Sequence, residues 1–212
     1  MTGGPADGTS PRDVVRAGYD AIGERYHTWS AATPTRLGQL DRLMERLPGG
    51  CTVLDLGCGP GDPVARRLTE RHRVVAVDVS AGQLAVARRN APHAMLVQAD
   101  VTSFAVRPGS MDAVVCCYVT GHLPPDAHAP LFAAVARWLR PQGLFLTTAP
   151  LEPGDGVEPD WLGLPMYFGA IGQGATLAAL ADAGLAVLSS EVITEDEAGV
   201  ERFLWVLAQR PM

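Results

Sequence analysis

The 212-residue chain carries a net charge of −6, and all 17 of its basic residues are arginines. Without lysine it cannot form a Schiff base with pyridoxal phosphate or a carbonyl substrate, nor hold a triphosphate through a phosphate-loop lysine. The acidic balance argues against a nucleic-acid partner, and no apolar run is long enough to span a membrane. We expect a cytoplasmic monomer or homodimer.

The chain begins with a polar segment, residues 1–11, which is rich in Gly and Pro and predicts a disordered tail. Apolar residues then recur at helical spacing over 12–28 and again over 34–47. These two segments predict a helical cap over residues 12–48, which precedes a core that runs from residue 49 to residue 212.

Strands and helices alternate from residue 49 to residue 150. Short, continuous apolar runs predict five buried strands, at 51–57, 73–79, 94–100, 111–119 and 143–149. The segments between most of them have helical spacing or a helix-capping residue. This alternation is typical of a Rossmann-like, doubly wound α/β fold with a parallel sheet.

The pattern changes after residue 150. Residues 151–172 are rich in Pro and Gly, have no clear period and carry the bulky residues Trp161, Met166, Tyr167 and Phe168. A segment of this length and kind predicts a lid. The last two apolar runs, 185–194 and 201–210, are joined by a short turn, so they must pair antiparallel. We therefore expect the sheet to end in an antiparallel hairpin.

The clearest motif is VLDLGCGPGD at residues 53–62. The first strand ends at Asp55, and the turn that follows contains three alternate glycines, Gly57, Gly59 and Gly61. Glycines at such a turn let the backbone bend tightly and let a ligand approach it. The dinucleotide fingerprint would need a glycine where Asp62 stands. Asp55 and Asp62 would repel a pyrophosphate and suit a ligand with a cationic centre.

Two more carboxylates end the next two strands. Asp78 lies 17 residues after Gly61, where a carboxylate can accept both hydroxyls of a ribose. Asp100 ends the third strand, where it can accept from an adenine amino group while the Val101 N–H faces the ring. Each aspartate alone has a second explanation, which is the capping of a turn or a helix.

In this order and at this spacing, residues 51–150 resemble the class I S-adenosylmethionine (SAM)-dependent methyltransferases. VLDLGCGPG resembles the first motif of that family, VVAVDVS the second, QADVT the third and MDAVVCCYVTGHLP the fourth. WLRPQGLFLTTAP resembles the fifth strand with the helix end before it. YDAIGERYHTW and ERFLWVLAQRP resemble a small bacterial subgroup of type 11/25. The resemblance implies a seven-stranded sheet with its last pair reversed.

The resemblance also implies SAM as cofactor and S-adenosylhomocysteine (SAH) as product. The glycines would admit the methionine moiety, whose amino group Asp55 would help orient and the Cys117 carbonyl would bind. Tyr19 and Tyr26 would close over this end, unless they only pack their helix on the sheet. The adenosine would be held by Asp78 on the ribose, Val79 on the adenine face, and Asp100 and Val101 at the adenine edge.

Methyl transfer needs a nucleophile held close to the methyl group and in line with it. His122, just after the fourth strand, is the best-placed base for an acceptor that arrives protonated. Its alternative role is structural, as a partner of a backbone group. Arg36 is a candidate for binding an anionic group of the substrate. The acceptor pocket is expected to include Tyr118, His122, Trp161 and Tyr167, although the lid residues also suit plain packing.

The sequence therefore predicts a SAM-dependent methyltransferase. Its acceptor would be an oxygen or nitrogen atom of a small, partly apolar molecule, in natural-product metabolism. No metal is expected, since no His, Cys or carboxylate cluster follows the fourth strand. Two alternatives stay open: a SAM-binding enzyme with other chemistry, pericyclase-like or decarboxylase-like, and a SAM-binding module without catalysis.

Overall fold

The computed structural model describes residues 9–30, 34–195 and 201–212. Most of the predicted tail, residues 1–8, lies outside these ranges. Its last residues do not belong to a tail, because Ser10 caps the first helix, α1 (Pro11–Ile22), by accepting a hydrogen bond from the Asp13 N–H. No helix in the described part of the chain is long and apolar enough to cross a membrane.

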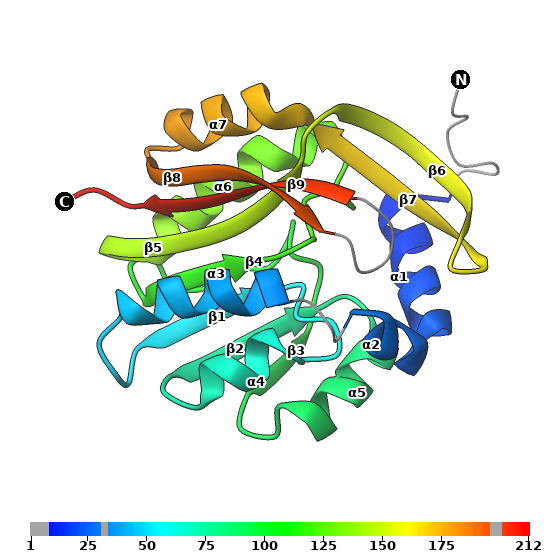
Figure 1. Ribbon diagram of the computed structural model, residues 1–212, viewed down its shortest axis with the longest axis horizontal. Helices are drawn as coiled ribbons and strands as arrows, with labels where there is room; N and C mark the ends of the chain where they lie inside the picture. Colours follow the sequence, from blue (N-terminus) through cyan, green and yellow to red (C-terminus); the bar gives the residue numbers. More distant parts are fainter. Residues whose placement is uncertain (1–8, 31–33, 196–200) are drawn as a thin grey trace.

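The sheet has seven strands, as the resemblance implies, and their order is β3-β2-β1-β4-β5-β9-β8 (Figure 1). Its parallel strands are β1 (Thr52–Leu56), β2 (Arg73–Asp78), β3 (Met95–Gln98), β4 (Met111–Cys116) and β5 (Leu139–Pro150). The final hairpin, β8 (Ala186–Glu195) and β9 (Glu201–Gln209), is antiparallel, and β9 also pairs antiparallel with β5. β5 is longer than expected because a bulge near Met111 extends its pairing back to Leu139.

Helices cover both faces of the sheet (Figure 1). One face packs against α3 (Pro34–Glu45), α4 (Val64–Thr69) and α5 (Ala81–Asn90), and the other against α6 (His128–Trp138) and α7 (Gly172–Asp182). A short 3-10 helix, η2 (Pro125–Ala127), precedes α6. Both apolar layers are continuous and well buried, as a doubly wound sheet requires.

The first predicted helix is divided in two. α1 ends at Gly23, whose φ of 52° suits a residue without a side chain, and α2 (Glu24–Ser30) follows directly. α1 is tied to the core through Asp20, which accepts from the Ser80 hydroxyl at 2.6 Å and from the Gly82 N–H at 3.0 Å. These bonds hold α1 over the carboxyl ends of β1 and β2.

The segment predicted as a lid without regular structure is a β-hairpin, β6 (Pro153–Trp161) and β7 (Leu164–Ile171). It packs on α1 at the right of Figure 1, through a buried cluster that joins Val15 and Ile22 to Met166. These strands could not be predicted from the sequence, because prolines and glycines interrupt the alternation of apolar and polar residues along them. α1 and this hairpin together form the wall that faces the carboxyl edge of the sheet.

Gly169 of β7 fixes the hairpin against the loop after β4. Its N–H donates to the Gly121 carbonyl at 2.9 Å, and a Cβ there would lie 2.2 Å from the Leu123 carbonyl oxygen. We expect Gly169→Ala to lower the free energy of unfolding by about 1–3 kcal/mol, because a rigid backbone must shift. Gly154→Ala, on the paired strand with open space around it, is the matched control in urea unfolding. Equal stability of the two variants would contradict this account.

Candidate active site

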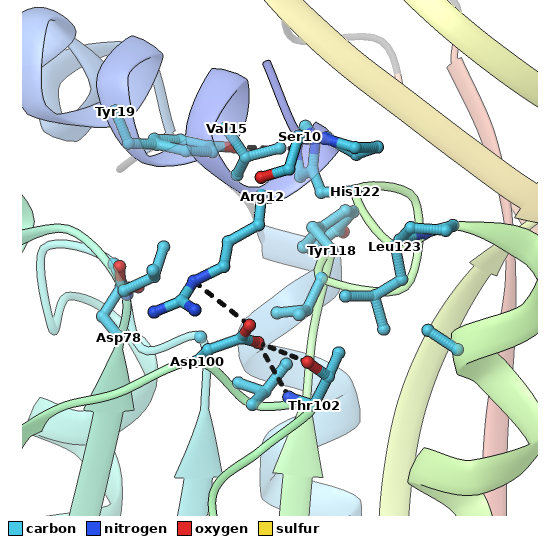
Figure 2. Close-up of a pocket in the computed structure, with 18 of the residues that line it drawn as sticks. Ser10, Arg12, Val15, Tyr19, Asp78, Asp100, Thr102, Tyr118, His122 and Leu123 are labelled. Carbon is cyan, nitrogen blue, oxygen red and sulfur yellow. Dashed lines mark hydrogen bonds and ion pairs between the residues drawn. The ribbon is translucent and has the colours of Figure 1, made fainter. Parts of the chain in front are cut away.

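A cavity of about 350 Å³ lies between α1 and the carboxyl ends of the parallel strands (Figure 2). Its floor is built by the glycine turn after β1 and by the ends of β2 and β3, and one wall by the segment after β4. It brings together eleven predicted site residues: Tyr19, Tyr26, Gly57, Gly59, Asp78, Val79, Asp100, Val101, Cys117, Tyr118 and His122. The motifs are thus adjacent in space although they are far apart in sequence.

The three glycines of the turn have different surroundings. Gly57 has φ of 67°, and a Cβ there would lie 2.2 Å from a Val119 methyl carbon; Gly59 has φ of 52° and lines the cavity beside Tyr26. Both positions therefore require glycine. Gly61 does not line the cavity, because it packs against α5, where a Cβ would lie 3.1 Å from the Ala87 Cβ. The structure thus shows a packing contact of Gly61 with α5, and the predicted contact of Gly61 with a ligand stays a prediction.

Asp78 fixes the turn from the neighbouring strand. Its two carboxylate oxygens accept from the Gly59 N–H at 2.8 Å and from the Ser80 N–H at 2.9 Å. Burial raises the pKa of Asp78 to about 6, against the opposing effect of these bonds. The cap of α5 itself is Ser80, whose hydroxyl accepts from the Gln83 N–H. Asp78 is therefore not the cap of α5, and it borders the cavity.

Asp100 connects the sheet to α1. One carboxylate oxygen accepts from both the N–H and the hydroxyl of Thr102 at 2.8 Å, and the other pairs with the Arg12 guanidinium at 3.2 Å. Figure 2 shows Arg12 descending from α1 across the cavity to reach this carboxylate. Arg12 could not be identified from the sequence, since an exposed arginine in a first helical turn has no motif around it.

Asp55 and Arg36 border a smaller pocket of about 30 Å³ that shares Tyr26, Gly57, Gly59 and Cys117 with the large cavity. Asp55 is 2% exposed, and its Oδ2 has no hydrogen-bond partner. Burial and the nearby Asp78 raise the pKa of Asp55 to about 7, while Arg36 opposes the shift. The Arg36 Nε is also buried without a partner, and its guanidinium lies 4.4 Å from the centre of the Tyr118 ring. A carboxyl group and a guanidinium, each with a buried atom that lacks a hydrogen-bond partner, thus border the same small pocket.

His122 is held by hydrogen bonds at both ring nitrogens. Nδ1 lies 2.9 Å from the Tyr167 carbonyl oxygen, and Nε2 lies 2.9 Å from the Tyr19 hydroxyl. Burial lowers the pKa of His122 to about 4, so the ring is neutral at ordinary pH. The structural and the catalytic interpretations of this histidine therefore coexist, because one nitrogen is tied to backbone while the other faces a cavity residue.

Two residues expected in the acceptor pocket do not line the cavity. Tyr167 is 1% exposed, and its hydroxyl donates to Asp155 at 2.6 Å, so only its carbonyl serves the site. Trp161 stands behind the cavity wall, with its ring centre 5.8 Å from Tyr19 and 6.1 Å from His122. The β-hairpin explains both placements, since Tyr167 is buried where the hairpin packs on α1 and Trp161 lies at the end of β6, at the tip of the hairpin.

The comparisons with known proteins agree with this geometry. Residues 53–143 match a family model described as a methyltransferase domain. Residues 53–143 therefore form a domain of the SAM-dependent methyltransferase family. Its cofactor is SAM, after which the family is named. Among the residues described, no group of three His, Cys, Asp or Glu side chains is placed to hold a metal ion.

The curated relatives of this chain include methyltransferases with different names, among them a trans-aconitate 2-methyltransferase and a ubiquinone biosynthesis O-methyltransferase. The chain is 39% identical over 113 residues to a trans-aconitate 2-methyltransferase of Azoarcus sp., a match that covers 51% of this chain and 43% of the relative. The chain spans about half the length of the curated relatives it matches. The names of such relatives therefore do not fix its acceptor.

Solved structures extend the likeness to nearly the whole chain. A Burkholderia thailandensis 1,6-didemethyltoxoflavin-N1-methyltransferase, solved with SAH, has a TM-score of 0.73 and 20% identity, and the match covers 98% of this chain and 93% of that one. The 4+2 cyclase SpnF has a TM-score of 0.72 and 16% identity, with both chains fully covered. At these identities the likeness shows the fold alone.

Proposed function

We propose that this methyltransferase moves the methyl group of SAM to an oxygen or nitrogen atom of a small, partly apolar acceptor. The observation that carries the proposal is the pair formed by Asp55 and Arg36, which have unpartnered buried atoms beside a glycine turn. An amino acid's ammonium and carboxylate are the groups that such a pair can satisfy together. SAM carries that zwitterion at one end and an electrophilic methyl group on a sulfonium.

The remaining cofactor contacts follow from the same placement. Asp55 would accept from the ammonium together with the Cys117 carbonyl, and Arg36 would bind the carboxylate. Gly57 and Gly59 would leave room for the methionine chain, and Tyr26 would cover it. At the other end, the ribose would lie at Asp78, and the adenine would lie by Val79, Val101 and Asp100. The Arg12 guanidinium would have to move as the adenine enters.

The acceptor would lie at the upper end of the cavity, near His122 and Tyr118. The described lining includes five apolar residues, Val15, Val119, Leu123, Pro124 and Ala127, and the charged side chain that α1 adds, Arg12, is paired with Asp100. A small neutral or weakly polar acceptor suits such walls better than a polycarboxylate does. His122 would serve as the base for an acceptor that loses a proton.

We place the protein in natural-product metabolism, in the cytoplasm, as a monomer or homodimer that acts on a small molecule without nucleic acid. Residues 12–48 and the β6–β7 hairpin would act together as the cap of the cavity. The fold-level likeness to the cyclase SpnF supports a second candidate, a SAM-binding enzyme that does not transfer the methyl group.

Methyl-labelled SAM distinguishes the two candidates. The protein is incubated with labelled SAM and a panel of neutral phenols, amines and heteroaromatic compounds, with trans-aconitate as the polycarboxylate. We expect label in a neutral acceptor, formation of SAH, and none in trans-aconitate. Tight binding of SAH combined with conversion of a panel compound into an unlabelled product would favour the second candidate and contradict the first.

A further inference from the structure

The hydrogen bonds of His122 determine which of its nitrogens carries the proton. The Tyr167 carbonyl oxygen, 2.9 Å from Nδ1, can only accept, so Nδ1 carries the hydrogen and donates it. In a neutral imidazole the other nitrogen, Nε2, is then unprotonated and can only accept. The Tyr19 hydroxyl, 2.9 Å away, is therefore the donor in the second bond. The backbone of β7 thus sets the direction of the whole chain of bonds.

This arrangement leaves the basic lone pair of His122 already occupied. An acceptor cannot give its proton to Nε2 directly unless Tyr19 first withdraws. Tyr19 itself lines the cavity between Tyr26 and His122, and its phenol oxygen keeps accepting capacity while it donates. The group best placed to meet the acceptor's proton is therefore the phenol.

We infer that Tyr19 is a catalytic residue, which takes the acceptor's proton while it passes its own proton to His122. The inference rests on the proposed function. The acceptor's O–H bond breaks, and its proton joins the Tyr19 oxygen as the Tyr19 proton moves to Nε2. The acceptor oxygen gains the methyl group, and the pair of electrons of the broken C–S bond stays on sulfur. The products are the methyl ether, neutral SAH and a protonated His122.

Burial opposes a positive charge on His122, and the positive charge that sulfur loses in the reaction offsets this cost. Burial lowers the pKa of His122 to about 4 and raises the pKa of Tyr19 well above its ordinary value, so both groups start neutral. The charged groups that act on Tyr19 include Asp78, which raises its pKa, and Arg36, which lowers it. The reaction removes one positive charge at sulfur and creates one on the imidazole, so the net charge of the enclosed site does not change.

The hairpin serves as the positioning element for this pair. His122 forms an isolated β-bridge with Gly169 of β7. The Tyr167 carbonyl that orients the His122 ring lies two residues earlier on the same strand. Tyr19 is held from the other side by α1, which packs on β7. The two partners thus come from elements that the hairpin joins, and their distance depends on its placement.

Nitrogen-15 NMR tests the hydrogen bond without any acceptor. In the protein with SAH bound, we expect His122 to be protonated at Nδ1 and its Nε2 resonance to shift in Tyr19→Phe. Tyr167→Phe is the matched control, since it removes a phenol that hydrogen-bonds to Asp155 and keeps the carbonyl. Protonation at Nε2, or no shift in Tyr19→Phe, would overturn the inference. A titration with SAH checks that each variant still binds the cofactor product.

Kinetics test the catalytic role. With catechol as a hydroxyl acceptor, Tyr19→Phe should lower kcat by about 10²–10⁴-fold. With nicotinamide, whose ring nitrogen has no proton to lose, the same variant should change the rate less than threefold. Equal rates of wild type and Tyr19→Phe on the hydroxyl acceptor would overturn the relay alone. Absence of label transfer by the wild type to any acceptor of the panel would count against the proposed function as well.

Discussion

Asp55→Asn is expected to stabilise the cofactor-free protein at pH 8 and to weaken its binding of SAH by about 10–100-fold. Asp55 is a buried carboxylate with an unpartnered oxygen, and burial raises its pKa to about 7. Since the folded pKa lies above the ordinary value of 3.8, the unfolded chain releases this proton more readily. The stability that the protonated group contributes is therefore present below about pH 4 and is lost as pH rises through about 7.

The loss reaches at most about 4 kcal/mol at pH 8, because each unit of pKa corresponds to about 1.4 kcal/mol. Asparagine has the same shape and no charge, so the free energy of unfolding of the variant does not fall in this way as pH rises. Thermal unfolding at pH 5 and pH 8 measures the difference, with Asp160→Asn at an exposed position of β6 as the control. SAH should flatten the pH dependence of the wild type, since its ammonium would neutralise Asp55.

Calorimetric titration with SAH measures the binding half of this prediction. A charge-assisted hydrogen bond contributes about 1.5–3 kcal/mol, which gives the expected weakening. Unchanged affinity for SAH in Asp55→Asn would show that the ammonium lies elsewhere. Unchanged stability at pH 8 would show that Asp55 gains its missing partner without the cofactor.

The second large effect is expected at His122. His122→Ala should lower kcat for a hydroxyl acceptor by about 10²–10⁴-fold and leave the affinity for SAH within about threefold. The active form of this base is the neutral ring. Because its pKa is lowered to about 4, kcat should rise with pH only through that region and stay level from about pH 5.5 to pH 8.

The pH profile of kcat with a fixed acceptor checks this prediction, with circular dichroism to confirm the fold at each pH. His93→Ala, an exposed histidine outside the cavity, is the control and should follow the wild type. A decline of wild-type activity centred near pH 6.5 would mean that His122 has an ordinary pKa. Full turnover by His122→Ala would remove it from the catalytic machinery.

The parts of the molecule that sequence predicted well are set by local chemistry. Continuous apolar runs specify buried parallel strands, and the turn with Gly57 and Gly59 can take its shape only with glycine. Asp78 and Asp100 end their strands, so parallel topology alone brings them to one edge of the sheet. Short spacing also determined the antiparallel pairing of β8 and β9, which the structure confirms.

The parts that sequence did not predict depend on contacts between distant segments. Arg36 borders the same pocket as Asp55 only because α3 lies across the sheet, and Arg12 reaches Asp100 only because α1 spans the cavity. Tyr167 was expected in the pocket, yet the β6–β7 pairing turns its ring towards Asp155. Gly61 belongs to a glycine motif, yet its neighbour in space is α5. Contacts of this kind, between segments far apart in the chain, leave no pattern in the local sequence.

A crystal structure with SAH is the most direct test of the central claim, that the cavity between α1 and the sheet holds SAM. We expect the amino-acid end of SAH between Asp55 and Arg36, the ribose at Asp78, and the sulfur facing the Tyr19–His122 pair. SAH bound elsewhere on the molecule, or bound in the cavity while Asp55 and Arg36 stay without a ligand partner, would contradict it.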